Sequence, residues 1–326
     1  DVTVDGVDIP AVVQVTKQAF AYAFNRETGK PIWAIEERPV PKALMPGEKL
    51  SPTQPFPTKP AAYDMQGLTH DDLIDFTPEL RAEALALLES YVLGPLFTPP
   101  SLWSREGKKG TVTIPGGWGA GNWHTGAFDP ETGIYYAVSH TMPTVWSVVP
   151  TTASSDATLA WATPQGEAQR VPTPRPHGLP ITKPPYGRIT ALDLNRGELA
   201  WMTANGDGPR YHPLLRDLDL PPLGIPNRPA PLVTKTLLLI GEGSDAIIGT
   251  MRGEGETTDP EQDQSWRWGR KFRAYDKATG AVLWETELPA GTTGGPMTYM
   301  HRGTQYVVVS VGGRDHDPEW VALALP

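Results

Sequence analysis

The sequence contains no cysteine among its 326 residues. This absence excludes disulfide bonds, thiolate nucleophiles and cysteine-based zinc or iron–sulfur sites. A chain without cysteine suits an oxidising compartment, but the absence does not identify that compartment by itself.

Positive charge and long apolar runs are scarce as well. The 28 Lys and Arg residues face 37 Asp and Glu, which gives a net charge of −9, and the basic residues form no cluster. Nucleic acid and membrane surfaces are therefore not expected partners. The longest apolar run, at residues 19–24, is far shorter than the roughly 20 residues of a membrane-spanning helix. No leader peptide precedes Asp1, so we expect that a signal was removed or that the chain begins inside a longer reading frame.

Helical segments are also expected to be few, because 33 Gly and 36 Pro interrupt the chain. One exception is predicted at about residues 78–93, where Thr77 is a good N-cap, Pro78 suits the first helical position and Gly94 ends the apolar periodicity. We place this helix in an insertion at about residues 34–110.

Two further segments are predicted to be exposed loops from their composition. Residues 150–185 are rich in Pro, Thr, Ala and Ser, and residues 252–264 are acidic with almost no apolar side chain.

One pattern recurs four times: Asp or Asn is followed by Gly four residues later and, in three copies, by Trp after four more. The copies occupy residues 23–33, 127–137, 191–201 and 274–284. The Asp or Asn side chain can bond the amides of a tight turn, and Gly accepts a positive φ, so each copy predicts a β-hairpin. We expect Trp33, Trp201 and Trp284 to be structural and to pack between repeated sheets.

Repeated hairpins at irregular spacing indicate four-stranded blades with long insertions, so an all-β propeller follows more naturally than a sandwich. Other apolar segments have the composition of strands. They lie at residues 11–15, 133–138, 235–240 and 305–311. Because hairpin copies lie on both sides of residues 150–185, we predict a single propeller domain over residues 1–326.

The hairpin with its terminal Trp resembles the tryptophan-docking repeat of the quinoprotein dehydrogenases, which use pyrroloquinoline quinone (PQQ). Residues 16–22 (TKQAFAY) resemble that family's strand with a cofactor-facing Lys. Further segments resemble the glucose and polyol branch. They are residues 51–56 (SPTQPF), 96–101 (LFTPPS), 121–124 (GNWH), 288–291 (LPAG), 296–299 (PMTY) and 311–313 (VGG).

This resemblance implies an eight-bladed β-propeller with PQQ on its axis, a divalent metal beside it, usually calcium and otherwise magnesium, and a periplasmic location. The chain resembles only the C-terminal half of such an enzyme, which carries its catalytic Asp and most metal ligands earlier. Four hairpins are too few for eight blades, so we expect a second chain or an upstream segment to carry the missing N-terminal blades.

Three residues are candidates for the cofactor site through this resemblance. The ammonium of Lys17 is expected near the quinone oxygens, where it would stabilise the charge that builds during hydride transfer. Asn122 and Trp123 lie in a glycine-rich segment that permits close backbone approach to a flat ligand. The structural alternatives are an ordinary solvated strand Lys at position 17 and a blade turn with a packed Trp at 122–123.

Other charged residues are weaker candidates. Arg273 is either a residue facing the axis or, as we prefer, a charged strand residue. Asp315, His316 and Asp317 alternate in direction on an extended segment, so we do not expect them to chelate a metal together. Arg314 or His316 is a candidate to line the substrate mouth.

The function expected from the resemblance is oxidation of an alcohol, polyol or aldose sugar. An Asp from outside this chain would remove the hydroxyl proton, and hydride would pass to PQQ. No haem attachment motif occurs, so the electron acceptor would be a separate quinone or cytochrome. The alternatives are a non-catalytic propeller scaffold and a sugar-binding propeller, neither of which would reduce a dye.

Overall fold

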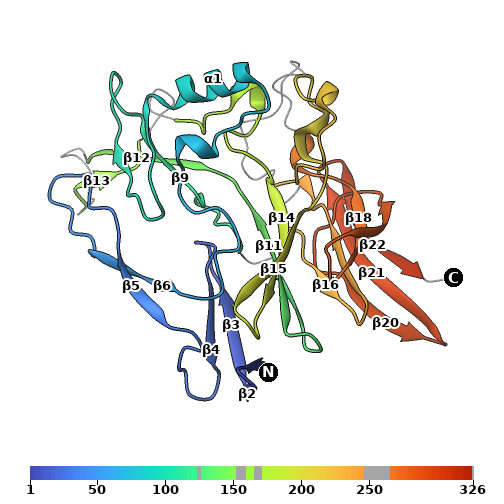
Figure 1. Ribbon diagram of the computed structural model, residues 1–326. Helices are drawn as coiled ribbons and strands as arrows, with labels where there is room; N and C mark the ends of the chain where they lie inside the picture. Colours follow the sequence, from blue (N-terminus) through green and yellow to red (C-terminus); the bar gives the residue numbers. More distant parts are fainter. Residues whose placement is uncertain (123–125, 152–158, 165–170, 246–264, 325–326) are drawn as a thin grey trace.

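The computed structural model describes residues 1–122, 126–151, 159–164, 171–245 and 265–324. It consists mainly of antiparallel sheets that stand side by side, with one α-helix at one end of the array (Figure 1). The predicted all-β propeller class is therefore confirmed. No helix among these residues is long and apolar enough to span a bilayer.

Three short sheets form the N-terminal part of the array. Their strand pairs are β1 (Val2–Val4) with β2 (Val7–Ile9), β3 (Ala11–Val15) with β4 (Ala21–Asn25), and β5 (Ile35–Pro39) with β6 (Thr53–Pro57).

Larger meandering sheets follow. The first contains β10 (Gly126–Asp129), β11 (Ile134–His140), β14 (Gly187–Asp193) and β15 (Glu198–Ala204). The second contains β16 (Leu232–Val233), β17 (Leu237–Gly241), β18 (Lys271–Asp276) and β19 (Val282–Glu287). The third contains β20 (Met297–His301), β21 (Thr304–Gly313) and β22 (His316–Ala324). Separate apolar clusters pack the first of these sheets against β3 and β4, the second against the first, and the third against the second, as a propeller requires.

The four repeated turns have the geometry that their sequence predicts. In each, the side chain of Asp or Asn accepts hydrogen bonds from backbone amides of the turn, at 2.8 to 3.1 Å. In each, the glycine has a φ between 69° and 74° and donates its N–H to the carbonyl four residues earlier. Local turn chemistry therefore sets these hairpins.

The copies do not correspond to one blade each. The copy at residues 127–137 forms β10 and β11, and the copy at 191–201 forms β14 and β15 of the same sheet. The copy without Trp is thus the first hairpin of a blade, and the Trp-bearing copy is its last.

Two of the tryptophans pack between sheets as predicted. A Cβ atom on Gly280 would lie 2.6 Å from Trp201 Cε3, and the Trp201 indole donates to the carbonyl oxygen of Lys277 at 3.2 Å. A Cβ atom on Gly197 would lie 3.0 Å from Trp33 Cε2. Trp284 differs, because it is 47% exposed.

Gly280→Ala is expected to lower the free energy of unfolding by about 1–3 kcal/mol more than Gly29→Ala. Both glycines occupy the same turn position with a similar φ, 74° and 69°, so the backbone cost is shared. Only Gly280 has a tryptophan against it, since a Cβ on Gly29 would meet nothing within 4 Å. Denaturant unfolding of the two variants measures the difference, and equal losses would show that Trp201 does not dock on Gly280.

A buried ion pair reinforces the same junction. Lys277 Nζ lies 2.6 Å from Asp129 Oδ2, which also accepts a hydrogen bond from Thr132. Burial alone would raise the pKa of Asp129, but these donors hold the pKa below its ordinary value. The backbone carbonyl of Lys277 accepts from the Tyr136 hydroxyl at 2.9 Å, so one turn residue ties two sheets together.

Asp129→Asn is expected to cost about 1–3 kcal/mol of unfolding free energy near neutral pH, because a charged hydrogen-bond acceptor is lost. Since the folded-state pKa of Asp129 is lowered, its contribution is present above the unfolded pKa, about 4, and disappears as the pH falls through the folded value. Unfolding curves between pH 7 and pH 2 should therefore converge for wild type and variant. Glu131→Gln is the control, because exposed Glu131 lies 4.0 Å from Lys277 and should cost little. A gap that stays constant down to pH 2 would contradict the assignment.

The helix begins where the sequence predicts and ends earlier. Helix α1 spans Pro78–Leu88, and the Thr77 hydroxyl accepts the N–H of Leu80 at 3.2 Å. The prediction of a helix to residue 93 was wrong, because β7 (Tyr91–Val92) instead pairs with β9 (Gly110–Thr113). Aromatic and β-branched side chains favour this strand over another helical turn.

The remaining strands and short helices surround α1. The sheet order is β13 (Trp161–Ala162), β12 (Thr144–Pro150), β9 and β7, with β8 (Ser101–Leu102) on β12. The 3-10 helices are η1 (His70–Asp72), η3 (Pro176–Gly178), η4 (Gly208–Tyr211), η5 (Arg216–Leu218) and η6 (Ser265–Arg267).

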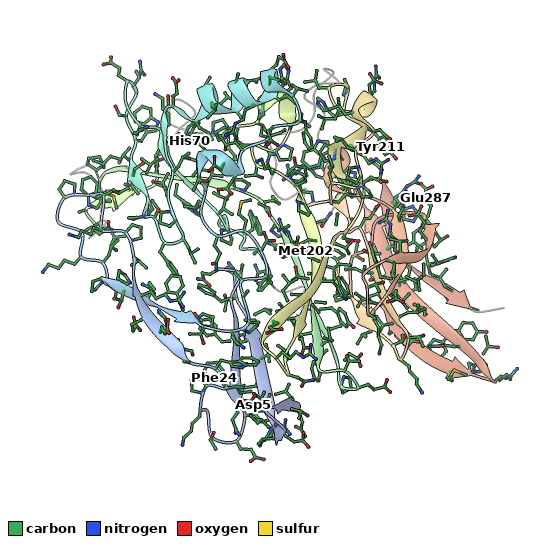
Figure 2. All side chains as sticks on the ribbon, viewed as in Figure 1. Asp5, Phe24, His70, Met202, Tyr211 and Glu287 are labelled. Carbon is green, nitrogen blue, oxygen red and sulfur yellow. The ribbon has the colours of Figure 1, made fainter. Side chains whose placement is uncertain are left out.

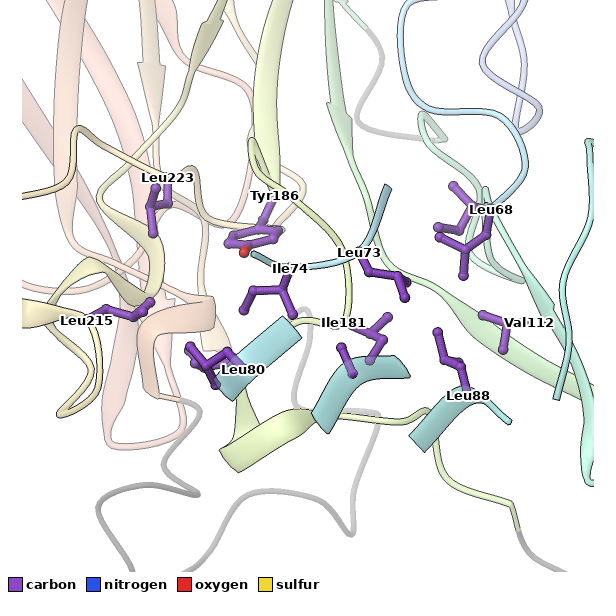
Figure 3. Packing of buried hydrophobic residues seen from close by; sticks show 13 residues of the cluster. Leu68, Leu73, Ile74, Leu80, Leu88, Val112, Ile181, Tyr186, Leu215 and Leu223 are labelled. Carbon is purple, nitrogen blue, oxygen red and sulfur yellow. The ribbon is translucent and has the colours of Figure 1, made fainter. Parts of the chain in front are cut away.

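The segment at residues 150–185 is not wholly an exposed loop, so that prediction was wrong for its second half. Leu179 and Ile181 are fully buried against α1 residues such as Leu80 and Leu88 (Figure 3). Burial of these few apolar residues outweighs the Pro-rich composition around them. The acidic segment 252–264 lies outside the described residues.

Helix α1 and the repeated turns lie at opposite ends of the sheets (Figure 1). Figure 2 shows Phe24 and Asp5 at one end of the array and His70 and Tyr211 at the other. Helix α1 lies at the His70 end (Figure 1). We call this the insertion end, and the opposite one the turn end.

Candidate functional site

Chain topology brings the candidate site residues to the insertion end. Lys17 lies in the turn between β3 and β4, and this turn is opposite to the Asn25–Gly29 turn that follows β4. Asn122 precedes β10, whose other end carries the Asp129 turn. Each residue therefore projects from the end that α1 covers, although 105 positions separate them in the sequence.

The Lys17 turn packs directly on the glycine-rich segment at residues 116–122. The carbonyl oxygen of Lys17 accepts the N–H of Ala120 at 2.9 Å. A Cβ atom on Gly119 would lie 2.5 Å from Lys17 Cγ, so only glycine allows this approach. The side chain of Lys17 is exposed and forms no ion pair with any residue that the structure describes. Its ammonium is thus available to a ligand.

Buried Tyr63 holds the two segments in place. Its hydroxyl donates to the carbonyl oxygen of Thr16 at 2.5 Å, and a Cβ atom on Gly121 would lie 2.6 Å from that hydroxyl. Its own carbonyl accepts from the Thr190 hydroxyl at 3.0 Å, and burial raises the pKa of Tyr63 well above its usual range. The sequence analysis missed Tyr63, because nothing local marks a tyrosine whose partners lie 47 and 127 positions away.

Asn122 and Arg228 converge on the backbone of Trp118. The Asn122 side-chain amide donates to the Trp118 carbonyl oxygen at 3.3 Å, and Arg228 Nη2 donates to the same oxygen at 3.3 Å. The Arg228 guanidinium also lies over the Trp118 ring, 4.5 Å from its centroid. Sequence analysis missed both Trp118 and Arg228, and the signals available were a Trp within a glycine run and one basic residue among prolines. Trp123 lies outside the described residues.

A hydrogen-bonded rim continues from Arg228 along the insertion end. Buried Asn227 donates to the carbonyl oxygen of Ser244 at 3.2 Å. The neighbouring Asp245 accepts the backbone N–H of Arg314 at 3.2 Å. The structure thus places Arg314 on this rim, whereas His316 Nε2 lies 3.0 Å from Glu319 Oε1.

Arg273 belongs to a buried charge network. Its Nη1 lies 2.7 Å from Glu242 Oε1, and its Nε donates to Glu285 at 3.1 Å. Arg273 is therefore held by two carboxylates of the described chain.

Within the described residues, no group of three or more His, Asp or Glu side chains is arranged to hold a metal ion. Asp315, His316 and Asp317 accordingly form no such group.

The donors at the insertion end fit a planar, acidic quinone such as PQQ. Lys17 and Arg228 supply positive charge, Asn122 supplies a side-chain amide, and Trp118, which is 39% exposed, supplies an aromatic face. Carboxylates and carbonyl oxygens are the acceptors that such donors bind. These residues would hold the quinone, although they enclose only one side of it.

Comparison with known proteins gives a family. The family model described as "PQQ: Glucose/ethanol/alcohol dehydrogenase, beta-propeller domain" matches residues 1–307. The glycerol dehydrogenase large subunit of Gluconobacter thailandicus is 30% identical over 95% of this chain and 41% of its own length. The quinate/shikimate dehydrogenase (quinone) of Acinetobacter baylyi is 30% identical over 97% of this chain and 38% of its own length.

Among solved structures, the quinohemoprotein alcohol dehydrogenase of Comamonas testosteroni aligns with 99% of this chain and 37% of its own length, with a TM-score of 0.47 and 18% identity. The chain thus spans about 40% of the length of these relatives, less than the half that we expected. The family match covers all four repeated hairpins and the candidate site. The chain belongs to the PQQ-dependent quinoprotein dehydrogenase family of β-propellers.

Proposed function

We propose that this chain supplies one side of the cofactor site in a PQQ-dependent enzyme that oxidises an alcohol, polyol or aldose sugar. The observation that carries this proposal is the convergence of Lys17, Asn122 and Arg228 on one glycine-rich segment, residues 116–122. A scaffold has no need for two cations on one segment that carries an exposed aromatic side chain.

Each residue of this chain has a definite task in the proposed site. When bound, PQQ supplies an ortho-quinone that accepts a hydride from the carbinol carbon of the substrate. Lys17 holds a positive charge and three N–H donors where negative charge develops. Asn122 orients the ligand, and Trp118 excludes water from one face of it. The base that removes the hydroxyl proton and most of the calcium or magnesium ligands belong outside these residues.

Because the relatives differ in their named substrates, they support the general reaction, oxidation of an alcohol group, and favour no single compound as the substrate. Their names specify glycerol, quinate or shikimate, and glucose. We therefore assign an alcohol, polyol or aldose as substrate, a separate quinone or cytochrome as electron acceptor, and the periplasm as location.

The test uses the complete enzyme that contains this chain. PQQ and Ca²⁺ are added to the purified apoprotein, bound quinone is measured by its absorbance after dialysis, and reduction of a redox dye is followed with glucose, glycerol and ethanol. Quinone-dependent dye reduction with at least one alcohol supports the proposal. Sugar binding without dye reduction would identify a lectin-like propeller, and failure to retain the quinone would identify a scaffold.

The rest of the ring is proposed to come from polypeptide beyond these 326 residues. Strand β20 is exposed along its whole length, and Met300 and Trp320 on this last sheet are 65% and 71% exposed. Trp284 is 47% exposed and lies against none of the described glycines, although it sits in the Trp position of the repeat. Such apolar surface is covered in a closed propeller. The mass of the purified native protein shows whether further polypeptide completes the ring. A stable monomer of 35.4 kDa would contradict the proposal.

A further inference from the structure

Arg228 is held by a rigid segment at the insertion end. It lies between Pro226 and Pro229, and its backbone N–H donates to the side chain of Asn227 at 2.7 Å. The Asn227 amide in turn donates to the carbonyl oxygens of Ser244 and Arg267, at 3.2 and 3.3 Å. A fully satisfied, buried Asn therefore fixes the point from which the Arg228 side chain projects.

The guanidinium of Arg228 is desolvated without a carboxylate to compensate. Burial lowers the pKa of Arg228 from its ordinary value. The guanidinium is nevertheless a cation at neutral pH, because an arginine side chain keeps its proton in proteins. No Asp or Glu of the described chain lies within ion-pair distance of it. The buried arginines Arg188 and Arg273 differ, because Asp64 and Glu242 lie 3.3 and 2.7 Å from them.

Most hydrogen-bonding capacity of the Arg228 side chain is also unused by the described residues. Of the five N–H groups of a guanidinium, the structure employs one, toward the Trp118 carbonyl oxygen. The Trp118 ring covers one face of the guanidinium and thereby fixes its plane. A planar fork with free donors in a partly dry position is suited to a carboxylate, which it binds through two parallel hydrogen bonds.

A second uncompensated cation lies on the same segment. Lys17 packs on Gly119, one residue from Trp118, and none of the described carboxylates pairs with it. The whole chain carries a net charge of −9, so two neighbouring cations without a counter-ion among the described residues form a local exception. Such a local positive field concentrates anions.

We propose that Arg228 binds a carboxylate in the site, donated either by the substrate, as in an alcohol that carries an acid group, or by the quinone itself. This inference rests on the proposed function. It assigns Arg228 a recognition role, whereas Lys17 faces the charge that changes during reaction.

Three variants of the complete enzyme test the assignment. Arg228→Met keeps an apolar side chain over Trp118 and removes every donor, and Arg228→Lys keeps the charge and removes the fork. Arg26→Met is the matched control, because it removes a positive charge at the turn end, where Arg26 pairs with Asp1 at 2.8 Å. Denaturant unfolding midpoints establish that the variants fold. If Arg228→Met does not fold, the role of Arg228 is tested with Arg228→Lys instead.

Two measurements separate the sources of the carboxylate. The first is the Kd of PQQ, from equilibrium dialysis. The second is the ratio of kcat/KM for glycerate to kcat/KM for glycerol. Glycerate has a carboxylate where glycerol has a hydroxymethyl group. Loss of a charge-assisted bidentate contact in Arg228→Met should either raise the Kd of PQQ or lower the glycerate-to-glycerol ratio, by about ten- to a hundredfold. Arg228→Lys should change the same quantity by less. A raised Kd identifies the quinone carboxylate, and a lowered ratio identifies the substrate.

Both quantities unchanged within about twofold, as expected for Arg26→Met, would overturn the role of Arg228 while the wild-type enzyme still oxidised alcohols. A wild-type enzyme that retains no quinone and oxidises neither substrate would instead overturn the proposed function, and the inference with it.

Discussion

Replacing Arg273 with methionine is expected to lower the free energy of unfolding by about 3–5 kcal/mol, because it leaves a buried carboxylate without its counter-charge. The side chains of Arg273 and Glu242 are only 6% and 4% exposed, and their charged atoms lie 2.7 Å apart. Burial alone would lower the pKa of Arg273, but the carboxylates of Glu242 and Glu285 raise it above its ordinary value. After the substitution, Glu242 retains the backbone N–H of Lys271 as a donor, at 3.1 Å.

The control for this effect lies in the same network. Glu285 pairs with Arg273 and with Lys271, but its side chain is 45% exposed, so Glu285→Gln should cost less than about 1 kcal/mol. The double variant Glu242→Leu with Arg273→Met should recover part of the loss, since no isolated charge remains buried. Denaturant unfolding of all variants checks the series. An Arg273→Met loss no larger than that of Glu285→Gln would mean that the buried pair contributes little.

The sequence predicted the hairpins well because their determinants are local. An Asp or Asn side chain, a glycine four residues later and alternating apolar residues all act within one turn, and the four turns share one geometry. The grouping of hairpins into blades was not predictable in the same way. Strands β11 and β14 pair across a long insertion, and no short-range pattern reports which sheet a hairpin joins.

Composition failed where a few apolar side chains outweigh many polar ones. Leu179 and Ile181 lie in a Pro- and Thr-rich segment that is typical of loops, yet they fill the space beneath α1. The predicted helix ended too late for a related reason. Tyr91 fits the helical spacing of the apolar residues before it, and nothing local in the sequence indicates that it pairs with Gly110 as part of a strand. In both cases a tertiary partner decided the local structure.

The candidate site was predictable only in part. Resemblance to a family indicated Lys17 and Asn122, but their meeting on one glycine-rich segment depends on tertiary packing. The position of Arg228 between prolines did not indicate its partner, because its contact with Trp118 spans 110 positions. A residue whose role depends on such a distant partner becomes visible only once the sheets are assembled.

Lys17→Ala is expected to lower the kcat of the complete enzyme by about a hundred- to a thousandfold, the effect of removing one preorganised donor from developing negative charge. The free energy of unfolding should change little. The Lys17 side chain is exposed and pairs with no described carboxylate. Its backbone carbonyl, which accepts from Ala120, and its Cβ atom beside Gly119 both survive the substitution. Steady-state kinetics with a redox dye and denaturant unfolding give the two quantities.

The matched control is Lys30→Ala, which removes an exposed lysine at the turn end of the same strand pair. Lys17→Arg should retain part of the rate, since it keeps the charge but displaces the donor. The Kd of PQQ distinguishes two origins of a lower rate. If Lys17 stabilises the transition state, kcat falls while the Kd of PQQ changes by less than about tenfold. The reason is that the negative charge that Lys17 stabilises develops only during the reaction and is absent from the quinone oxygens before it. A Lys17→Ala enzyme with the turnover of Lys30→Ala would refute the role, whatever the family resemblance implies.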